Sequence, residues 1–378
     1  MTRRVKFNVP TLVGKEFAYI GEALQRGHLS GNGHFSQLCE KSISGAVGGG
    51  RVLLTHSCTA ALEMAAILSE IGPGDEVIMP SFTFTSTANA FVLRHAVPVF
   101  IDIRPDTLNM DETLIEAAIT PRTKAICVVH YAGVACDMDV IMDIARRHGL
   151  RVIEDAAQAL HATWRGRPLG SFGDFAALSF HETKNVISGE GGALIVNDPS
   201  AAERAEIIWE KGTNRAQFYR GEVAKYTWVD VGSSFLPSEL TAAFLYAQLE
   251  DGVETTARRV AAWNRYHAAF GALELSGRIR RPVVPQDCGH NGHIYYILTN
   301  ETAQRDDVVK RMSEQDVAAV MHYVPLHSAP AGLRFARTPA AMPHTDDLAA
   351  RLIRLPLHPQ IDPAQQQAVV AAVTAAVA

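Results

Sequence analysis

The chain has 378 residues, of which 47% are hydrophobic and 20% are charged, and its formal net charge is −5. A single hydrophobic core seldom serves more than about 300 residues, so this length predicts a soluble, globular protein of two domains. The mildly acidic balance excludes a protein that holds nucleic acid by general basicity, and we expect no nucleic-acid partner.

The cysteines and the apolar segments restrict the class of protein further. Five cysteines are an odd number, and no two of them form a CxxC pair. We therefore expect no disulfide framework and no metal site, and we expect a reducing, cytoplasmic location. No apolar run approaches the ~20 residues of a membrane-spanning helix, so we expect no membrane attachment.

Short apolar runs alternate with helical segments over much of the first 200 residues. A first helix is expected over residues 16–26, before a loop at residues 28–33. The expected strands are residues 52–54, 76–79, 97–101, 125–129, 151–153 and 176–180, and the expected helices are residues 59–71, 111–119 and 138–148. Strands that alternate with helices are typical of βαβ units and predict a largely parallel sheet covered on both faces.

The rest of the chain is helix-rich at first and then mixed. The expected helices are residues 200–211, 238–250, a further run to about residue 270, 303–313, 348–353 and 368–378, and the expected strands are residues 293–298 and 317–323. This pattern predicts a small α+β domain after the sheet domain. We place the boundary near residue 250, which gives a large domain at residues 1–250 and a small domain at residues 251–378.

Polar residues follow several of the expected strands, where ligands bind in open α/β sheets. Ser57, Cys58 and Thr59 come after residues 52–54 and open a helix. Free N–H groups at a helix start, with hydroxyl groups beside them, form a site suited to phosphate. Capping of the helix by Ser57 alone would explain the same residues.

Aromatic and acidic side chains follow the next strands. Phe82 and Phe84 come after residues 76–79, and either ring could stack on a flat cofactor or simply lie in the core. Glu154 and Asp155 end a buried strand, where two carboxylates destabilise the fold unless at least one meets a cation. A protonated pyridine nitrogen would be such a cation.

Lys184 lies just beyond the apolar run at residues 175–180. An amine that is desolvated or close to other cations loses its charge more readily, and the neutral amine can form a Schiff base. A solvated loop lysine is the plainer explanation of this residue taken alone. With a phosphate cradle, an aromatic ring and a buried acid at the same sheet edge, however, Lys184 completes the parts of a pyridoxal-phosphate site. The chain contains no GxGxxG segment and no P-loop, so neither a dinucleotide fold nor a P-loop enzyme is expected.

Several segments of the chain match a known family. They are residues 28–31 (HLSG), 74–81 (GDEVIMPS), 154–158 (EDAAQ), 322–327 (HYVPLH) and 355–357 (LPL). With them the chain resembles the DegT-type sugar aminotransferases, which are pyridoxal-phosphate enzymes of the aspartate aminotransferase fold. The resemblance implies an α/β protein of PLP-dependent transferase fold type I, with a large domain around a mostly parallel mixed sheet and a smaller α+β domain at the C-terminal end.

Further segments resemble one branch of that family, the transaminases that make dTDP-4-amino-4,6-dideoxygalactose. They are residues 57–60 (SCTA), 130–136 (HYAGVAC), 179–185 (SFHETKN) and 210–215 (EKGTNR). This resemblance implies transfer of the amino group of L-glutamate to C4 of dTDP-4-keto-6-deoxy-D-glucose, for the synthesis of surface polysaccharide. The cofactor would alternate between pyridoxal 5'-phosphate and pyridoxamine 5'-phosphate in two half-reactions.

The resemblance also implies roles for individual residues. Lys184 would form the Schiff base and carry a proton between cofactor and substrate, and Asp155 would pair with the pyridine nitrogen. Gln158 would lie against the ring near its phenolic oxygen, and Phe84 would stack on the ring. The phosphate would be held by Ser57, Cys58, Thr59 and Ser179.

The chain departs from the family at residues 232–236 (GSSFL). Many relatives carry Gly-Tyr-Asn-Tyr-Arg here, and the asparagine reaches the phosphate of the neighbouring subunit. Ser234 replaces that asparagine, and its shorter side chain puts this contact in question. The resemblance still implies a homodimer with active sites at the subunit interface.

Six residues are candidates for binding the nucleotide sugar: Lys211, Arg215, Arg220, His322, Tyr323 and His327. The first three lie in or beside a polar loop, where they would be cations for a diphosphate or ordinary surface charges. The other three would line the sugar pocket from the small domain, or serve as structural residues there. No arginine stands out as the group that binds the carboxylate of the amino donor.

Three other functions stay open at this point. The nearest is an aminotransferase for another keto-sugar nucleotide, with the keto group at C3 or with UDP or GDP as the carrier. The second is a pyridoxamine-dependent sugar dehydratase, but such relatives have histidine in place of the lysine, so Lys184 argues against it. The third is a non-catalytic sensor of the same fold that binds the cofactor.

Overall fold

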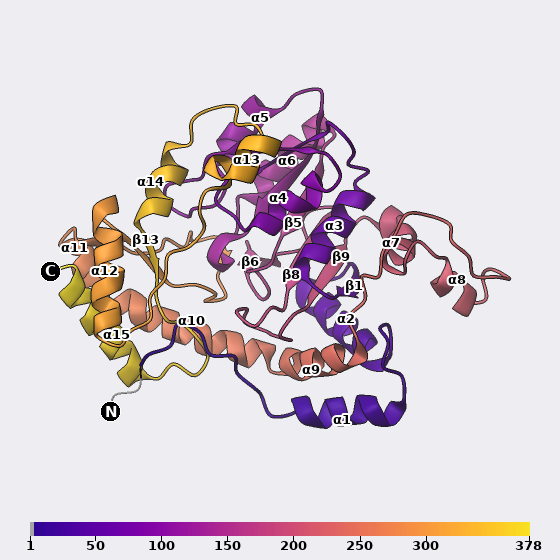
Figure 1. The fold of residues 1–378 in the computed structure, drawn as a ribbon, viewed down its shortest axis with the longest axis horizontal. Helices are drawn as coiled ribbons and strands as arrows, with labels where there is room; N and C mark the ends of the chain where they lie inside the picture. Colours follow the sequence, from indigo (N-terminus) through magenta and orange to yellow (C-terminus); the bar gives the residue numbers. More distant parts are fainter. Residues whose placement is uncertain (1–3) are drawn as a thin grey trace.

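A seven-stranded sheet forms the centre of the larger part of the protein (Figure 1). The computed structural model describes residues 4–378. The strands are, in their order across the sheet, β1 (Arg51–Thr55), β9 (Gly192–Val196), β8 (Phe175–Ser179), β5 (Arg151–Asp155), β4 (Thr123–Val129), β2 (Glu76–Pro80) and β3 (Val97–Ile101). Strand β9 is antiparallel to both of its neighbours, and the other adjacent pairs are parallel. The mostly parallel mixed sheet predicted from the sequence is confirmed.

Helices cover both faces of this sheet, and the residues of each strand alternate between the faces. In β1, Val52 and Leu54 pack in one apolar cluster and Leu53 packs in the other. Because successive strand residues point to opposite faces, strands that are apolar throughout must be buried on both sides. The helices concerned are α2 (His34–Val47), α6 (Met138–His148) and α9 (Glu239–Glu250) in the first cluster, and α3 (Cys58–Leu68), α4 (Thr85–Val92) and α7 (Ala202–Trp209) in the second.

A smaller sheet lies in the C-terminal part of the chain. Its strands, in order, are β10 (Ile279–Arg280), β12 (Tyr296–Thr299) and β13 (Leu352–Arg354), and it packs with α10 (Gly252–Ala269), α12 (Thr302–Glu314) and α15 (Pro363–Ala376). Trp263 and Tyr295 lie in the shared core, which Val5 joins from the N-terminal segment. Helices α9 and α10 run end to end along one side of the molecule (Figure 1), with Asp251 between them. A domain boundary near residue 250 stays a prediction, and it would fall at this junction.

The remaining helices and short strands connect or extend the two sheets. They are α1 (Glu16–Arg26), α5 (Ile115–Ala118), β6 (Thr163–Trp164), β7 (Arg167–Pro168), α8 (Arg215–Tyr219), α11 (Gly271–Leu275), β11 (Cys288–Gly289), α13 (Pro330–Phe335), α14 (Pro343–Arg351) and the 3-10 turns η1 (Glu112–Leu114), η2 (Tyr131–Gly133), η3 (Pro199–Ala201) and η4 (Leu326–Ser328). Between residues 4 and 378, none of the helices combines the length and the apolar character that crossing a membrane requires.

Most of the predicted elements are present, but not all. The helices predicted at residues 16–26 and 138–148 have the bounds of α1 and α6. The strand predicted at residues 317–323 is wrong, because only Val317 and Val320 in this stretch form isolated bridges to other segments. An extended, apolar sequence does not become a strand of a sheet unless a neighbouring strand pairs along its length.

The helix predicted at residues 348–353 is also partly wrong. Helix α14 ends at Arg351, and residues 352–354 form β13. Leu352 and Ile353 pair with β12 and are fully buried. A short apolar run fits a core strand as well as the last turn of a helix, and periodicity alone does not separate the two.

Glu76, at the start of β2, ties the large sheet to the C-terminal part of the chain. Arg337 donates from Nε and Nη2 to the two carboxylate oxygens, at 3.0 and 2.7 Å, and Arg122 and Thr120 donate at 2.6 and 2.7 Å. These bonds, above all those from Arg337, lower the pKa of Glu76 to about 2 although the side chain is buried. The carboxylate is therefore charged in the folded protein over the whole neutral range.

An arm extends from α7 away from the sheet (Figure 1). We use this name for residues 212–231, which include α8. Tyr219 and Trp228 on the arm are 72% and 77% exposed, and Phe218 and Tyr226 are exposed as well. Large apolar side chains gathered on one extension are typical of a surface that another protein covers.

We expect Glu76→Gln to lower the free energy of unfolding by roughly 3 kcal/mol at neutral pH, because the variant loses charge-assisted hydrogen bonds from two arginines, each of which contributes about 1.5–3 kcal/mol. The folded-state pKa lies below the ordinary value of 4.5, so this stabilisation is complete above pH 4.5 and is lost as the pH falls toward about 2. Urea unfolding at neutral pH and near pH 3 measures it, and the difference between the two proteins should shrink at the lower pH. Asp143→Asn, in an exposed ion pair, should leave unfolding nearly unchanged. An equal difference at both pH values would contradict the assignment.

Candidate active site

A cavity of about 530 Å³ lies at the carboxyl edge of the large sheet. One wall comes from the ends of β4, β5 and β8, and the other comes from the C-terminal part of the chain. A cavity of this volume can hold a cofactor together with part of a substrate. The predicted site residues that it brings together are Ser57, Cys58, Thr59, Phe84, Asp155, Gln158, Ser179, Lys184, His322 and Tyr323.

The start of α3 forms the predicted phosphate end of the cavity. Ser57 caps the helix, because its hydroxyl oxygen accepts a hydrogen bond from the N–H of Ala60 at 3.1 Å. The N–H groups of Cys58 and Thr59 lie in the first turn, where a helix offers them no carbonyl partner, so they can donate to an anion. Gly192 of β9 packs directly on this turn, and a Cβ there would overlap the backbone of Ser57 and Cys58. The neighbouring strand thus fixes the helix start in place.

Glu154 and Asp155 at the end of β5 point in opposite directions, as successive strand residues do. Glu154 lies on the side away from the cavity. It binds Nε2 of His130 at 3.0 Å and accepts 2.7 Å hydrogen bonds from three N–H groups of residues 170–173. Burial alone would raise the pKa of Glu154, but the bonds from His130 and the backbone outweigh it, and the pKa is lowered. The carboxylate of Glu154 thus has hydrogen-bond partners within the protein and does not require a ligand.

Asp155 faces the cavity and forms no ion pair with a cationic side chain of residues 4–378. Thr87 donates from its hydroxyl to Oδ2 at 2.7 Å, and Ala157 donates from its N–H to Oδ1 at 3.2 Å. Burial raises the pKa of Asp155, and these two donors and the charge of Lys184 oppose the rise. A buried carboxylate with spare acceptor capacity can pair with a protonated ring nitrogen in the cavity.

Lys184 lines the same cavity under conditions that favour the neutral amine. Burial lowers the pKa of Lys184, and the electrostatic influence of Cys58 and Asp155 opposes this effect. The positive charge of Arg354 lowers the pKa further. A neutral amine is the form that adds to a carbonyl carbon, so the surroundings of Lys184 suit carbonyl chemistry.

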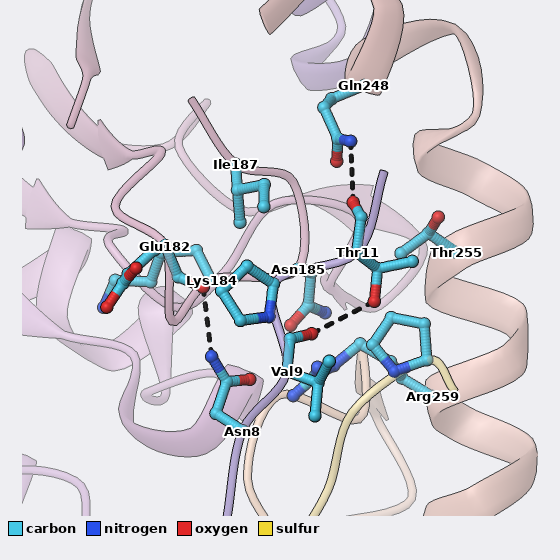
Figure 2. A pocket seen from close by; sticks show the side chains of 12 residues that line it. Asn8, Val9, Thr11, Glu182, Lys184, Asn185, Ile187, Gln248, Thr255 and Arg259 are labelled. Atoms are coloured by element: carbon cyan, nitrogen blue, oxygen red, sulfur yellow. Dashed lines mark hydrogen bonds between the residues drawn. The ribbon is translucent and has the colours of Figure 1, made fainter. Parts of the chain in front are cut away.

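The segment that carries Lys184 is fastened to the N-terminal segment (Figure 2). Asn8 donates from Nδ2 to the carbonyl oxygen of Glu182 at 3.1 Å, and Gln248 of α9 donates to the carbonyl oxygen of Thr11 at 2.9 Å. The gap between these segments measures only about 10 Å³, which is room for a water molecule and not for a substrate. The N-terminal segment therefore supports the segment that carries Lys184 and does not form a substrate site there.

Asn185 connects the same segment to the C-terminal part of the chain. Its Nδ2 donates to the carbonyl oxygen of Asn291 at 2.9 Å, and its Oδ1 lies 3.0 Å from Nδ1 of His293. His293 also lines the cavity. Burial lowers the pKa of His293 well below its ordinary value, and the charges of Lys184 and other cations lower it further, so its ring is neutral.

Phe84, Tyr323 and His322 form an aromatic side of the cavity. Phe84 is 57% exposed, so its ring faces the cavity and not the core. Tyr323 stacks on His322 with 3.6 Å between the ring centroids, and its hydroxyl oxygen accepts from Nε2 of Gln158 at 2.9 Å. The Oε1 of Gln158 accepts from the N–H of Ala132 at 2.7 Å. Gln158 therefore joins the two walls of the cavity.

The other predicted residues do not line this cavity; they are Ser234, Lys211, Arg215, Arg220 and His327. The hydroxyl of Ser81 forms a 2.7 Å hydrogen bond with Nδ1 of His327, so this histidine has a structural contact. The remaining four lie on or at the base of the arm, where both arginines form ion pairs with acidic residues of the same region. Within one copy of the chain they are separate from the cavity, and their roles stay predictions.

Sequence reasoning missed Arg354, Thr87 and His293. Arg354 is a lone cation inside the apolar run at residues 352–355, and the same kind of signal had identified the lysine. Thr87 lies four residues after Thr83, the spacing that brings two side chains together at a helix, and their hydroxyl oxygens are 2.8 Å apart. His293 has no comparable signal in the sequence.

Residues 10–374 match the sequence profile of the DegT/DnrJ/EryC1/StrS aminotransferase family. The chain belongs to this family. It is 35% identical over 363 residues to the spore coat polysaccharide biosynthesis protein SpsC of Bacillus subtilis, an alignment that covers 94% of this chain and 92% of SpsC. It is also 35% identical over 349 residues to GDP-perosamine synthase of Caulobacter vibrioides, with 91% of this chain and 89% of that protein covered.

The fold of this DegT-family chain is shared with the crystal structure of S. venezuelae DesV in complex with a ketimine intermediate. The TM-score is 0.90 at 30% sequence identity, over 99% of each chain. The protein is a pyridoxal-phosphate-dependent nucleotide-sugar aminotransferase. The predicted cofactor is thereby confirmed.

The residues of the cavity fit pyridoxal phosphate. The first turn of α3 offers N–H groups to its phosphate, the buried carboxylate of Asp155 offers a partner to its ring nitrogen, and Lys184 offers an amine to its aldehyde. In the described part of the chain, no three His, Cys, Asp or Glu side chains gather as the ligands of a metal ion would.

We expect Thr87→Val to lower kcat/KM about tenfold, because a hydrogen bond to a charged group contributes about 1.5 kcal/mol. The variant removes a donor that stabilises the carboxylate of Asp155, so the acid limb of the pH–rate profile should also move to higher pH. Steady-state rates across pH measure both effects. Thr83→Val leaves the bond to Asp155 intact and is the matched control; identical behaviour of the two variants would show that Thr87 does not act through Asp155.

Proposed function

We propose that this aminotransferase moves the amino group of L-glutamate to C4 of dTDP-4-keto-6-deoxy-D-glucose, giving dTDP-4-amino-4,6-dideoxy-D-galactose for surface polysaccharide. One observation carries the choice of substrate. Three of the four segments that resemble the corresponding branch of the family contribute to the cavity. Residues 57–59 line it, as do Ser179, His181, Thr183 and Lys184, and Ala132 of residues 130–136 binds Gln158 in its wall. The likeness to that branch is thus located where a substrate would bind.

Bound pyridoxal phosphate supplies an aldehyde carbon for amino groups and a ring that withdraws electrons. Asp155 holds the proton on the ring nitrogen, which keeps the ring electron-withdrawing. The amine of Lys184 would take the proton from the α-carbon of L-glutamate and would return it as the amino group is transferred. With the sugar bound, Lys184 delivers a proton to C4 of the sugar and so sets its configuration. One positioned acid–base group of this kind contributes about 10²–10⁴ in rate.

Three other titratable groups of the cavity leave this task to Lys184. Burial lowers the pKa of both His293 and His322 well below the ordinary value, so both rings are neutral and neither has a proton to give at neutral pH. Burial raises the pKa of Tyr323 far above its ordinary value, so its hydroxyl keeps its proton. These three side chains orient the substrate and exclude water.

A GDP-linked keto sugar is the second candidate substrate. It is favoured by the 35% identity to GDP-perosamine synthase over 91% of this chain. A non-catalytic sensor is the weakest alternative, because Lys184 and Asp155 line one cavity with a phosphate cradle. An assay must therefore compare nucleotide carriers.

We expect Lys184→Ala to abolish turnover, because the variant loses both the bond to the cofactor and the group that carries the proton. The measurement is transfer of nitrogen-15 from labelled L-glutamate to a panel of dTDP-, UDP- and GDP-linked keto sugars, followed by NMR of the product's configuration. The unsubstituted enzyme should label the dTDP sugar at C4. Lys124→Ala, an exposed lysine at the other end of β4, should behave like the unsubstituted enzyme. Label in a GDP or UDP sugar would replace the proposed substrate, and label in none would overturn the proposal.

We also propose that the active protein is a homodimer in which the arm of one copy covers the cavity of the other. The exposed aromatic residues Tyr219 and Trp228 support this, because an isolated chain would leave them in water. The predicted diphosphate cations Arg215 and Arg220 lie on the same arm, outside the cavity of their own chain. An arm that reaches a second copy would bring them to that copy's substrate.

We expect Trp228→Asp to convert the dimer into monomers and to reduce turnover, because a charge on the covered face must be desolvated. Light scattering after gel filtration measures the assembly at several protein concentrations. Leu275→Asp is the control, since Leu275 is 92% exposed on α11, far along the chain from the arm. A dimer that survives Trp228→Asp unchanged would place the interface elsewhere.

A further inference from the structure

Arg354 is a cation in the wall of the 530 Å³ cavity that has no acidic partner. It lines the cavity together with Lys184, His322 and Tyr323. No carboxylate of residues 4–378 forms an ion pair with it, and its Nε is buried without a hydrogen-bond partner. Burying a cation unpaired destabilises a fold, and the loss is recovered when an anion binds.

The backbone of Arg354 is held from both sides. In β13 it pairs with Tyr296 of β12, and on the other side it exchanges hydrogen bonds of 2.8 and 3.2 Å with Val320. The guanidinium carbon lies 4.7 Å from the centre of the Phe7 ring. A cation that stacks on an aromatic ring and is anchored on a strand is placed before a ligand arrives.

The chemistry of the guanidinium group suits an anion with two oxygens in one plane, such as a carboxylate or a phosphate. Its planar fork matches the two oxygens of a carboxylate and forms two parallel hydrogen bonds with it. The phosphate of the cofactor is provided for by the first turn of α3, so a second anion site in the same cavity is free for a substrate. Both substrates of the reaction carry anionic groups: the amino donor has carboxylates and the nucleotide sugar has a diphosphate. The position of these groups relative to the reacting carbon distinguishes the two substrates.

The position of Arg354 near the reacting amine distinguishes the two substrates. Its charge acts on both Lys184 and His322, where it favours the uncharged forms. In an α-amino acid, the carboxylate is attached to the carbon that bears the amino group. In a nucleotide sugar, the diphosphate is attached to C1 and lies across the sugar ring from C4. An anion bound beside Lys184 therefore matches the amino acid.

We propose that Arg354 binds the α-carboxylate of the amino donor. The proposal deepens the function proposed above and rests on it only in taking an α-amino acid such as L-glutamate as the donor; it does not depend on the identity of the sugar. With the carboxylate held by Arg354, the bond from the α-carbon to hydrogen is turned toward Lys184. Release of the oxo acid leaves the guanidinium without a partner again, which makes room for the keto sugar.

The test uses the holoenzyme and the variants Arg354→Gln, which removes the charge, and Arg354→Lys, which keeps the charge but loses the fork. Arg280→Gln is the matched control. Arg280 lies on β10 of the same small sheet, and its Nε is likewise buried without a partner, but it donates to the carbonyl oxygen of Pro105 and does not line the cavity. Circular dichroism and melting temperatures establish that each variant is folded.

The first measurement is binding, without turnover. Glutarate carries the two carboxylates of the donor and lacks the amine, so calorimetry on the holoenzyme reports carboxylate binding alone. Arg354→Gln should weaken glutarate binding by about 10- to 100-fold and Arg354→Lys by less, since a charged hydrogen bond contributes about one to two powers of ten. Arg280→Gln should stay within about twofold of the unsubstituted enzyme. Equal glutarate affinity in Arg354→Gln, or no glutarate binding by the unsubstituted holoenzyme, would overturn the proposal.

The second measurement identifies which carboxylate is bound. Conversion of the cofactor to its amine form is followed by absorbance with L-glutamate or with 4-aminobutyrate, which lacks the α-carboxylate, and with no sugar present. Arg354→Gln should slow the reaction of L-glutamate at least tenfold and leave that of 4-aminobutyrate nearly unchanged. Equal losses with both amines, or a loss of affinity for dTDP and not for glutarate, would assign Arg354 elsewhere. Because no sugar takes part, failure of the proposed sugar substrate would leave this result intact.

Discussion

Two opposite charges face one cavity without meeting each other, and much of the structure keeps them apart. Asp155 ends β5 of the large sheet, and Arg354 ends β13 of the small one. If they paired, each would satisfy the other and the cavity would close. Instead two contacts connect the walls, one between Glu76 and Arg337 and one between Gln158 and Tyr323. Both charges therefore stay free to bind ligands.

Those unpaired charges also explain why the site suits a reaction in two halves. In the function proposed above, Asp155 is matched by a cation that stays bound, the ring nitrogen of the cofactor. By our proposal, Arg354 is matched by the carboxylate of a substrate, which binds and leaves in each cycle. Both charges act on Lys184: burial and Arg354 lower its pKa, while Asp155 opposes the change. The lysine therefore responds to what occupies the cavity, since each ligand alters the charge around it.

The sequence was most informative where one local rule decides the outcome. Asp155 and Lys184 could be placed at one sheet edge because strands that alternate with helices are parallel and end on the same side. Helix α6 was predicted to the residue because Asp137 caps it and Gly149 ends it. Both predictions follow from local sequence alone, without knowledge of which segments meet in three dimensions.

Long-range pairing was beyond the reach of sequence reasoning. Residues 317–323 are apolar and extended, but whether they form a strand depends on partners such as Val5 and Arg354, hundreds or tens of residues away. Arg354 carried a signal as a lone cation in an apolar run, but its exposure to the cavity depends on the pairing of β13 with β12, which local sequence does not predict. Val5 packs in the core of the C-terminal part, so a boundary near residue 250 does not describe all of the packing.

The four hydrogen bonds of Glu154 have a consequence for the neighbouring acid. A strand that slips by one residue turns every side chain to the opposite face. In β5 such a slip would exchange two adjacent carboxylates of nearly the same shape, and the hydrophobic pattern would resist it only weakly at that end. His130 and the N–H groups of residues 170–173 accept Glu154 in one register alone. The buried glutamate thus fixes the register of β5 at this end, so that the carboxylate facing the cavity is that of Asp155.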